Sequence, residues 1–382
     1  MSQFIDKGEL YWFERRSFLE AAGYRLRPKF QPGFVPKNTT NSKDFGDEYT
    51  AKHPRRQIMD VECAGDGKRL MLKSVSRKKH PFEVEIGNLF SRTPISEDPR
   101  NHCIPILEVL QDPADGDKQI IVMPMMMKFH ETVFDTVGEV VDCFRQIFEG
   151  IQVMHQMFIA HRDCGVLNLV VDPSQLYPEG FHPVHMWRNT TNDGFACFIT
   201  RTECWPRYYI IDFGLSRRYQ PENGPPMEEV ILGADKSPPE HRQPGWCNPF
   251  PTDIYHLGNL LRTSFIHSHE STIRGTGNHK PLHFLKPLVA DMTQEDPRLR
   301  PTIGEVIERF DSVCSRLSNW HLRRPGQAIP WHDWIGQRIR QLKNTFKGVP
   351  PLPPYEPPRS PNLTPSMRAF YTLTPAQWAA EH

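Results

Sequence analysis

Hydrophobic residues recur at helical spacing in several stretches of the chain. The longest stretch lies between residues 139 and 158, where apolar side chains follow one another in steps of three and four and form one stripe. Its members are Val140, Phe144, Ile147, Phe148, Ile151, Met154 and Phe158. This pattern predicts one long helix that ends just before His161. Shorter patterns predict helices at 9–22, 81–90, 254–266, 282–292 and 302–317.

Strand-like runs precede most of these helices. Residues 57–63 and 69–75 have the composition of strands, and the Ala64-Gly65-Asp66-Gly67 segment between them contains the Asp-Gly pair that favours a tight turn. A β-hairpin is therefore predicted here, with a further short strand at 119–123. Residues 24–54 show no periodicity, and we expect them to lie extended over a surface. Strands followed by helices predict an α+β fold.

Composition narrows the class of protein. The chain has 382 residues, of which 38% are hydrophobic and 24% charged, so it can bury a sizeable core. The formal net charge of +1 gives no overall attraction to nucleic acid or to a membrane, and we expect neither as a partner. The eight cysteines are scattered without a C-x-x-C pair, which favours neither a zinc site nor a disulfide framework. With no long apolar stretch, an intracellular, cytoplasmic protein is expected.

Two short segments carry the chemistry. Residues 161–168, directly after the long predicted helix, read HRDCGVLN, and residues 208–214 read YYIIDFG. In this order and context the chain resembles the protein kinase family, which has H-R-D-x-x-x-x-N in its catalytic loop and D-F-G after a strand. Further similarities follow in the family's order, at Lys73 in a strand, Pro238-Pro239-Glu240, Asp253 at the start of a helix, and Arg300. Segments such as YRLRPKFQPGFVP and GADKSPPEH also resemble kinase-like proteins of mushroom-forming fungi.

The resemblance implies a domain organisation. It covers roughly residues 57–318 and implies a two-lobed, protein-kinase-like fold. The expected parts are an N-terminal helix and docking segment (1–56), a β-rich N-lobe with hinge (57–127), a mainly helical C-lobe (128–318) with an insertion at about 172–206, and a C-terminal extension (319–382). Eight prolines at 350–365 predict a polyproline-like tail. The insertion and the tail are the segments expected to contact a partner.

The resemblance also implies a set of functional residues. Phosphoryl transfer needs a positioned carboxylate, metal ligands and a cation. Asp163 would orient the substrate hydroxyl and accept its proton, Asn168 and Asp212 would hold Mg²⁺, and Lys73 would contact the α and β phosphates of ATP bound between the lobes. Met126, in the hinge, would offer its backbone N–H to adenine.

Three structural roles accompany these functional ones. A carboxylate should hold Lys73, and the candidates are Glu83 and Glu85. Glu83 is preferred because Ile86 and Phe90 follow it at helical spacing. Glu240 and Arg300 are expected to form an ion pair, since burying either charge alone would be costly. Asp253 is expected to hold the backbone of the catalytic loop.

The sequence departs from the family pattern in three places. No G-x-G-x-x-G precedes the strand at 57–63, and we hypothesise that Lys52, Arg55 and Arg56 supply the missing contacts to phosphate. Gly165 stands where serine/threonine kinases have a lysine, and Gly233-Ala234 replaces the usual G-T of the activation segment, residues 212–240. The expected function is transfer of the ATP γ-phosphoryl group to a protein hydroxyl, serine or threonine in preference to tyrosine. The alternative is a pseudokinase that acts as a nucleotide-binding scaffold.

Overall fold

The computed structural model describes residues 5–34, 53, 55–266, 280–326 and 331–354. It is 40% helical and 15% strand, so the predicted α+β class is confirmed. Contacts between residues divide the chain into two compact units. The first comprises Met1–Ser91, Ile104–Met127 and Asp172–Ile199, and the second comprises Arg92–Cys103, Lys128–Val171 and Thr200–His382. None of the described helices is long and apolar enough to cross a membrane.

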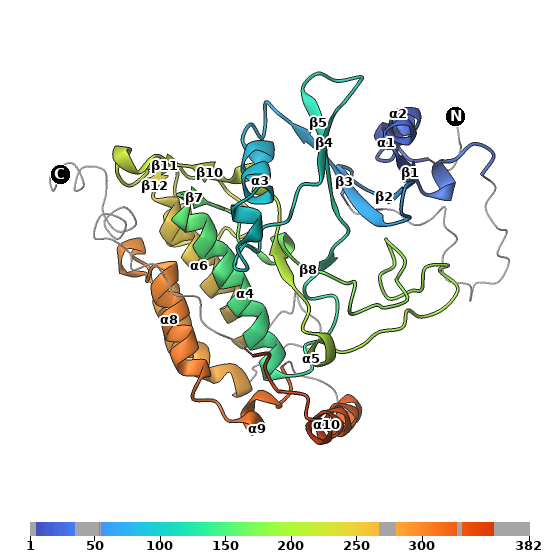
Figure 1. The fold of residues 1–382 in the computed structure, drawn as a ribbon. Helices are drawn as coiled ribbons and strands as arrows, with labels where there is room; N and C mark the ends of the chain where they lie inside the picture. The colour runs from blue at the N-terminus through green and yellow to red at the C-terminus, as the bar shows by residue number, and fades with distance from the viewer. Residues whose placement is uncertain (1–4, 35–52, 54, 267–279, 327–330, 355–382) are drawn as a thin grey trace. The chain divides into compact units, whose positions relative to one another are not determined.

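The first unit is built on a curled antiparallel sheet of five strands (Figure 1). Along the sheet they run in the order β1 (Tyr24–Leu26), β2 (Ile58–Cys63), β3 (Arg69–Ser76), β5 (Lys118–Pro124) and β4 (Glu108–Gln111). Helix α3 (Glu83–Ser91) follows β3 along the chain. The strands β2, β3 and β5 and helix α3 agree with the predictions, whereas β1 and β4 were not predicted.

The predicted hairpin is confirmed between β2 and β3. The two strands pair in antiparallel register, with Asp60 opposite Met71. At the turn the Cys63 N–H donates to the Lys68 carbonyl at 2.8 Å, and the Gly67 N–H donates to the Cys63 carbonyl at 2.9 Å. Gly67 has a φ of +70°, a conformation that glycine adopts without steric cost. The Asp-Gly signal therefore located the turn because the backbone there needs positive φ.

The N-terminal region forms two short helices instead of the single helix predicted at 9–22. Helix α1 spans Leu10–Glu14 and helix α2 spans Arg16–Ala21. The break falls at Arg15, whose φ and ψ of −96° and 4° leave the helical region and whose Nε donates to Asp112 Oδ2 at 2.7 Å. Gly23, at a φ of +90°, follows α2 and leads the chain into β1.

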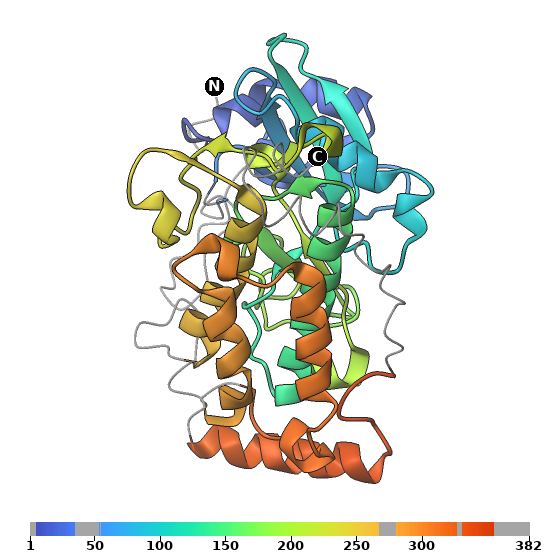
Figure 2. The same cartoon turned by 90° about the vertical axis from the view of Figure 1, so that its left-hand side faces the viewer.

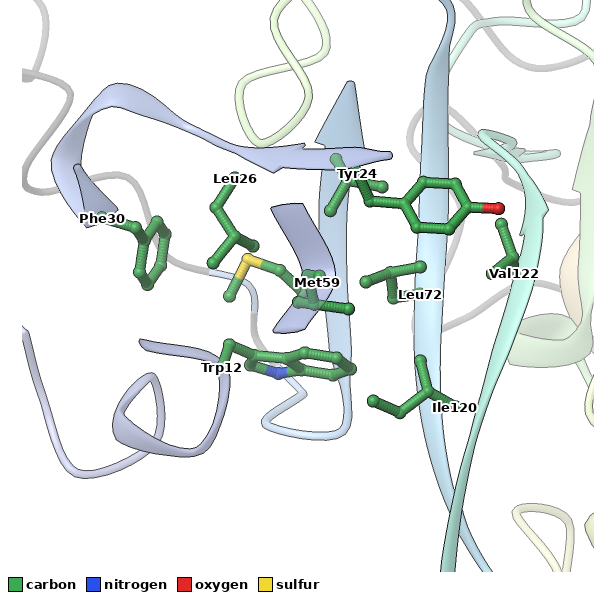
Figure 3. Packing of buried hydrophobic residues seen from close by; sticks show 10 residues of the cluster. Trp12, Tyr24, Leu26, Phe30, Met59, Leu72, Ile120 and Val122 are labelled. Carbon is green, nitrogen blue, oxygen red and sulfur yellow. The ribbon is translucent and has the colours of Figure 1, made fainter. Parts of the chain in front are cut away.

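These helices contribute to the core of the first unit. A cluster of buried side chains joins the N-terminal region to one face of the sheet (Figure 3). Its members are Trp12, Leu19, Tyr24, Leu26, Phe30, Met59, Val61, Leu72, Ile120 and Val122. Full burial of one such aliphatic or aromatic side chain contributes about 1.5–3 kcal/mol. Instead of lying over a surface, residues 24–30 are part of this core, while 35–52 and 54 lie outside the described residues.

The second unit is mainly helical. Helix α4 (Val137–Gln156) confirms the predicted long helix and begins with a capping box in which Thr136 and Glu139 bind each other's backbone N–H groups. It packs on α8 (Ile303–Cys314), where the rings of Phe148 and Phe310 meet edge to face with centroids 5.2 Å apart. The other helices are α5 (Arg201–Cys204), α6 (Pro249–Leu261), α7 (Lys286–Met292), α9 (Asn319–Leu322) and α10 (Trp331–Phe346). Of these, α5, α9 and α10 were not predicted.

Short strand pairs in the second unit hold the segments that carry the motifs. Strand β8 (Leu169–Val171) pairs with β9 (Tyr208–Ile210), and β7 (Ile159–Ala160) pairs with β10 (Arg217–Arg218). A third pair joins β11 (Glu228–Glu229) to β12 (Trp246–Cys247), and β6 (Met127–Lys128) lies beside β8. The HRD segment thus runs between β7 and β8, and the DFG segment between β9 and β10.

Several boundaries differ from the prediction. The helix expected at 254–266 begins earlier, at Pro249, and ends in a wider turn at Arg262–Ile266. The segment expected as an insertion in the helical lobe, 172–206, is divided, because Asp172–Ile199 belongs by its contacts to the first unit and Thr200 onward to the second. The proline-rich tail predicted at 350–365 lies outside the described residues from 355 onward.

Candidate functional site

In the first unit, Lys73 forms an ion pair with Glu83, as preferred from the sequence. Lys73 lies in the middle of β3, opposite Ile58 on β2 and Ile121 on β5. Its Nζ atom contacts Glu83 Oε1, and the two side chains are only 13% and 4% exposed. Glu83 is the first residue of α3, whereas Glu85 is exposed to solvent. The pair is fixed because β3 and the first turn of α3 present their side chains to each other.

In the second unit, Asp253 of α6 holds the backbone of the HRD segment, as predicted. Its carboxylate accepts the N–H of His161 at 2.8 Å and the N–H of Arg162 at 2.7 Å, and His155 Nε2 lies 3.1 Å away. Burial alone would raise the pKa of Asp253, but the hydrogen bond and charge of His155, with the charges of His161 and His256, hold it below its ordinary value. The carboxylate therefore stays ionised and fixes the loop.

Asp163 is held from two directions. Asn168 Nδ2 donates to Asp163 Oδ2 at 2.8 Å and to the Asp163 carbonyl at 2.9 Å. The Ala234 N–H donates to the other carboxylate oxygen, Oδ1, at 2.8 Å. A Cβ atom added at Gly233 would lie only 2.3 Å from Asp163 Oδ1, so the close approach of this segment requires glycine. Each oxygen of Asp163 thus accepts one hydrogen bond, which fixes the orientation of the carboxylate.

The DFG segment lies directly against the HRD segment. The Ile211 N–H donates to the Asn168 carbonyl at 3.0 Å, and the Ile211 carbonyl accepts from His161 Nε2 at 3.1 Å. The rings of His161 and Phe213 meet edge to face with centroids 5.9 Å apart. These contacts place the backbone of Asp212 beside that of Asn168, the two residues expected to hold Mg²⁺.

Two residues in these segments adopt the left-handed conformation. Arg162 has a φ of +70° and Asp212 a φ of +71°. For residues other than glycine this conformation costs about 1–3 kcal/mol and is retained where the surroundings enforce it, often at functional sites. Here the enforcing contacts are the hydrogen bond from Arg162 to Asp253 and the packing of Phe213 on His161. The strain therefore lies at Asp212, which is predicted to hold Mg²⁺, and at Arg162, directly before Asp163.

The activation segment is fixed in its middle and at its C-terminal end. Arg162 Nη2 donates to the Glu229 carbonyl at 3.2 Å, and Nη1 lies 3.7 Å from the carboxylate of Glu228. Farther along, Arg300 binds Glu240 through two hydrogen bonds of 2.7 Å, which confirms the predicted pair. Although burial raises the pKa of Glu240, Arg300 brings it below the ordinary value. Arg162 and Arg300 thus hold the segment through its carboxylates and a backbone carbonyl.

The structure also shows what precedes β2, where no glycine-rich loop was found. The neighbouring strand in the sheet is β1, so residues 27–57 connect the two strands. Both ends of this connection bind the buried carboxylate of Asp60, with Arg27 Nε at 2.9 Å and His53 Nε2 at 2.6 Å from Oδ1. Strand β1 could not be predicted from the sequence, because three residues are too short to show a strand pattern.

The hypothesis on the basic residues of this connection stays a prediction. Lys52 lies outside the described residues. Arg55 and Arg56 line a cavity of about 220 Å³ within the first unit, and Trp12 Nε1 donates to the Arg56 carbonyl at 3.0 Å. Met126 is half-buried in the connection between β5 and β6, and its expected contact with adenine also stays a prediction.

The donor set in the second unit suits a hard cation. Because the amide nitrogen of Asn168 binds Asp163, its oxygen is the atom that would face a metal, and Asp212 adds a carboxylate. Oxygen ligands of this kind, few in number, are what Mg²⁺ uses when phosphates and water complete its shell. Within the described part of the chain, no three His, Cys, Asp or Glu side chains gather in an arrangement that could hold a metal ion.

Comparison of the sequence with models of protein families and with curated proteins finds no match to either.

Proposed function

We propose that this protein is a kinase that transfers the γ-phosphoryl group of ATP to a hydroxyl group of a protein, serine or threonine in preference to tyrosine. The observation that carries the proposal is the fixed orientation of Asp163, whose two carboxylate oxygens accept hydrogen bonds from Asn168 and Ala234. Phosphoryl transfer depends on positioning and on charge, so a rigidly held carboxylate beside two metal-ligand candidates is the arrangement that this chemistry needs.

Each residue has a role in this proposal. Asp163 orients the acceptor hydroxyl and takes its proton, while Asp253 keeps the loop that carries Asp163 in place. Asn168 and Asp212 would hold Mg²⁺, which when bound neutralises charge on the phosphates. Lys73 would supply positive charge to the α and β phosphates, and Glu83 holds its ammonium group in place.

The proposal includes the finer description of the fold. We assign the sheet unit with α3 to the N-lobe of a protein-kinase-like fold and the helical unit to the C-lobe. Support comes from the placement of Lys73 on the central strand β3, its pairing with the first helix after that strand, and the buried Glu240–Arg300 pair. In this assignment the contact of Arg162 with Glu228 replaces a contact with a phosphorylated residue.

A pseudokinase that binds nucleotide and acts as a scaffold is the second candidate. Two observations favour it. Gly165 provides no cation where the family has a lysine. A Cβ atom added at Gly165 would lie 3.7 Å from the side chain of Ala234, which provides no cation either. The long connection at 27–57 stands where a glycine-rich loop would bind phosphate through backbone N–H groups. Both features reduce the number of donors for the γ phosphate.

Transfer of label from γ-labelled ATP to a basic protein substrate distinguishes the two candidates. We expect label in the presence of Mg²⁺ with the wild-type protein and a loss of at least 100-fold with Asp163→Asn. Glu83→Gln should lower transfer, whereas Glu85→Gln, a matched change on the exposed side of the same helix turn, should leave it unchanged.

Binding is measured separately as the shift in melting temperature on addition of Mg²⁺ and ATP. A shift with the wild-type protein, a smaller one with Lys73→Met, and no transfer of label by the wild-type protein would favour the scaffold. Equal transfer by the wild type and Asp163→Asn would contradict the kinase, and the absence of any shift in melting temperature would contradict both candidates.

A further inference from the structure

Helix α10 turns its polar side toward the second unit. Gln337, Gln341 and Asn344, spaced so that they share one face, are at most 4% exposed. Gln337 Nε2 donates to the Asp135 carbonyl at 2.9 Å, and Gln341 Oε1 accepts from Arg323 at 3.2 Å. The helix is therefore held in place through hydrogen bonds, whereas a surface helix of a globular protein normally docks by its apolar side.

The opposite side of α10 is apolar and exposed. Ile335, Ile339, Leu342 and Phe346 follow one another in steps of four, three and four, so they form one stripe. Their exposed fractions are 46%, 49%, 56% and 89%. Figure 2 shows α10 in red-orange, running across the end of the second unit beyond α8. We call these four residues the outer stripe. Four large apolar side chains in a row leave a continuous patch in contact with water, which usually marks an interaction surface.

Positive charge borders the outer stripe. The helical period places Arg338 on one flank and Lys343 and Lys347 on the other, and both lysines are exposed. Residues 334–354 contain no Asp or Glu. Tryptophan adds to the same border, since the Arg338 guanidinium lies 5.2 Å from the ring centre of Trp334 and 5.3 Å from that of Trp320, which is 69% exposed. The surface is thus apolar in the middle, basic at the edges and lined with tryptophan.

We propose that α10 binds the surface of a membrane that contains anionic lipids. Apolar side chains flanked by lysine, arginine and tryptophan are typical of helices that lie in the plane of the headgroup region. The charge complements anionic headgroups, and the outer stripe would enter the region between headgroups and acyl chains. Hydrogen bonds to Asp135 and Arg323 hold the polar side of α10 against the second unit. The outer stripe therefore faces solvent, where it could lie against a flat membrane surface.

This inference does not rest on the kinase proposal. It does go against the expectation, drawn from the net charge of +1, that no membrane would be a partner. The overall charge is uninformative here because basic residues gather in one short segment, 334–354, that contains no Asp or Glu. Helix α10 would lie on the membrane surface, which agrees with the finding that no described helix could cross one.

Sedimentation of the full-length protein with lipid vesicles tests the proposal. We expect binding to vesicles of phosphatidylcholine with about 30% phosphatidylserine, and about tenfold weaker binding to phosphatidylcholine alone, since each surface cation contributes attraction to anionic headgroups. Ile339→Asp/Leu342→Asp should abolish binding to both. Lys343→Glu/Lys347→Glu should abolish the preference for phosphatidylserine but retain the weak binding to phosphatidylcholine.

The control places the same change on comparable apolar residues elsewhere. Leu107 and Phe195 are 53% and 77% exposed in the first unit, so Leu107→Asp/Phe195→Asp should bind vesicles like the wild type. Equal melting temperatures verify that the variants fold. Absence of vesicle binding by the wild type would overturn the proposal. The proposal would also be overturned if Ile339→Asp/Leu342→Asp still bound vesicles but no longer associated with itself or with an acidic protein, as the wild type does.

Discussion

At the residue scale, the carboxylate of Asp163 depends on a neighbour with no side chain. The Ala234 N–H reaches Oδ1 only because Gly233 lets the backbone of the activation segment pass at van der Waals distance. A methyl group at position 233 would collide with the Asp163 side chain, so it could be accommodated only if that carboxylate or the activation segment moved. Position 233 therefore sets the position of Asp163 as directly as Asn168 does.

Gly233→Ala should move Asp163 and lower phosphoryl transfer by about 100-fold, the typical cost of displacing a catalytic group by roughly 1 Å. Gly245→Ala is the matched control, because an added Cβ there meets nothing within 4 Å. We expect the control to keep full transfer of label from γ-labelled ATP. Both variants should show the same shift in melting temperature with Mg²⁺ and ATP, and equal transfer by the two would refute the positional role of Gly233.

Several pairings could be predicted at this scale because charged residues leave a clear mark in a sequence. The order of the motifs, together with the cost of burying a single charge, predicts two ion pairs and one structural carboxylate. These are Lys73 with Glu83, Glu240 with Arg300, and Asp253. The contact of Ala234 with Asp163 could not be predicted, since a backbone N–H is present in nearly every residue and carries no signature.

At the scale of elements, the connection between β1 and β2 is closed by one buried carboxylate. Asp60 on β2 binds Arg27, directly after β1, and His53, shortly before β2. Burial of Asp60 alone would raise its pKa, but the charge of Arg27 and the hydrogen bond from His53 lower it to about 2. Its negative charge is thus more stable in the folded chain than in water, and it holds the two ends of residues 27–57 together.

The pH dependence of stability should report this clamp. Because the folded pKa lies below the ordinary value of 3.8, the contribution of Asp60 is complete above that value and is lost as the pH falls toward 2. The free energy of unfolding of the wild type minus that of Asp60→Asn should therefore shrink by about 2 kcal/mol between about pH 5 and pH 2. Urea denaturation at several pH values measures it.

Asp66→Asn serves as the control for this measurement. Asp66 is exposed in the hairpin turn, where water screens its contact with Lys68. The free energy of unfolding of the wild type minus that of Asp66→Asn should therefore change much less between about pH 5 and pH 2. If the free energies of unfolding of the wild type and Asp60→Asn changed equally with pH, Asp60 would not act as a clamp.

The elements that were predicted are those with a long or chemically distinct pattern. The helix α4 contains six of the seven apolar residues of the predicted stripe, and the β2–β3 hairpin has an Asp-Gly turn. By contrast, β1 has only three residues, and the alternation of Tyr24, Arg25 and Leu26 is too short to predict a strand. The helical spacing of Ile335, Ile339, Leu342 and Phe346 is present in the sequence, but no helix was predicted there, and only the prolines at 350–365 were interpreted.

At the scale of the whole molecule, the stretch that resembles a kinase is shorter than the stretch that folds. The resemblance begins at residue 57, yet Trp12, Leu19 and Phe30 are fully buried against the sheet of the first unit. These contacts link residues far apart along the chain, and such contacts leave no local pattern. The sequence therefore predicted the class of fold and the motif residues, but not which distant segments complete each unit.

A fragment of residues 57–318 should consequently fail to form a stable first unit. Without the N-terminal helices, Met59, Leu72 and Ile120 would lose the side chains that cover them, and the exposed face should cause aggregation. The matched fragment 1–318 ends at the same residue and keeps the cover, so it should remain in solution and melt cooperatively. Gel filtration and near-ultraviolet circular dichroism compare the two. The same elution volume and spectrum for both fragments would rule out this role of residues 1–56.

The division of the first unit among three stretches of chain also bears on how the protein is made. Ribosomes add residues one after another at about 5–20 per second, and domains generally fold as they emerge. This unit cannot make all its contacts until Ile199, about halfway along the chain, has left the exit tunnel. The strands of its sheet are all synthesised by Pro124, but until Ile199 has emerged the unit would remain incomplete, and chaperones would have the opportunity to bind it.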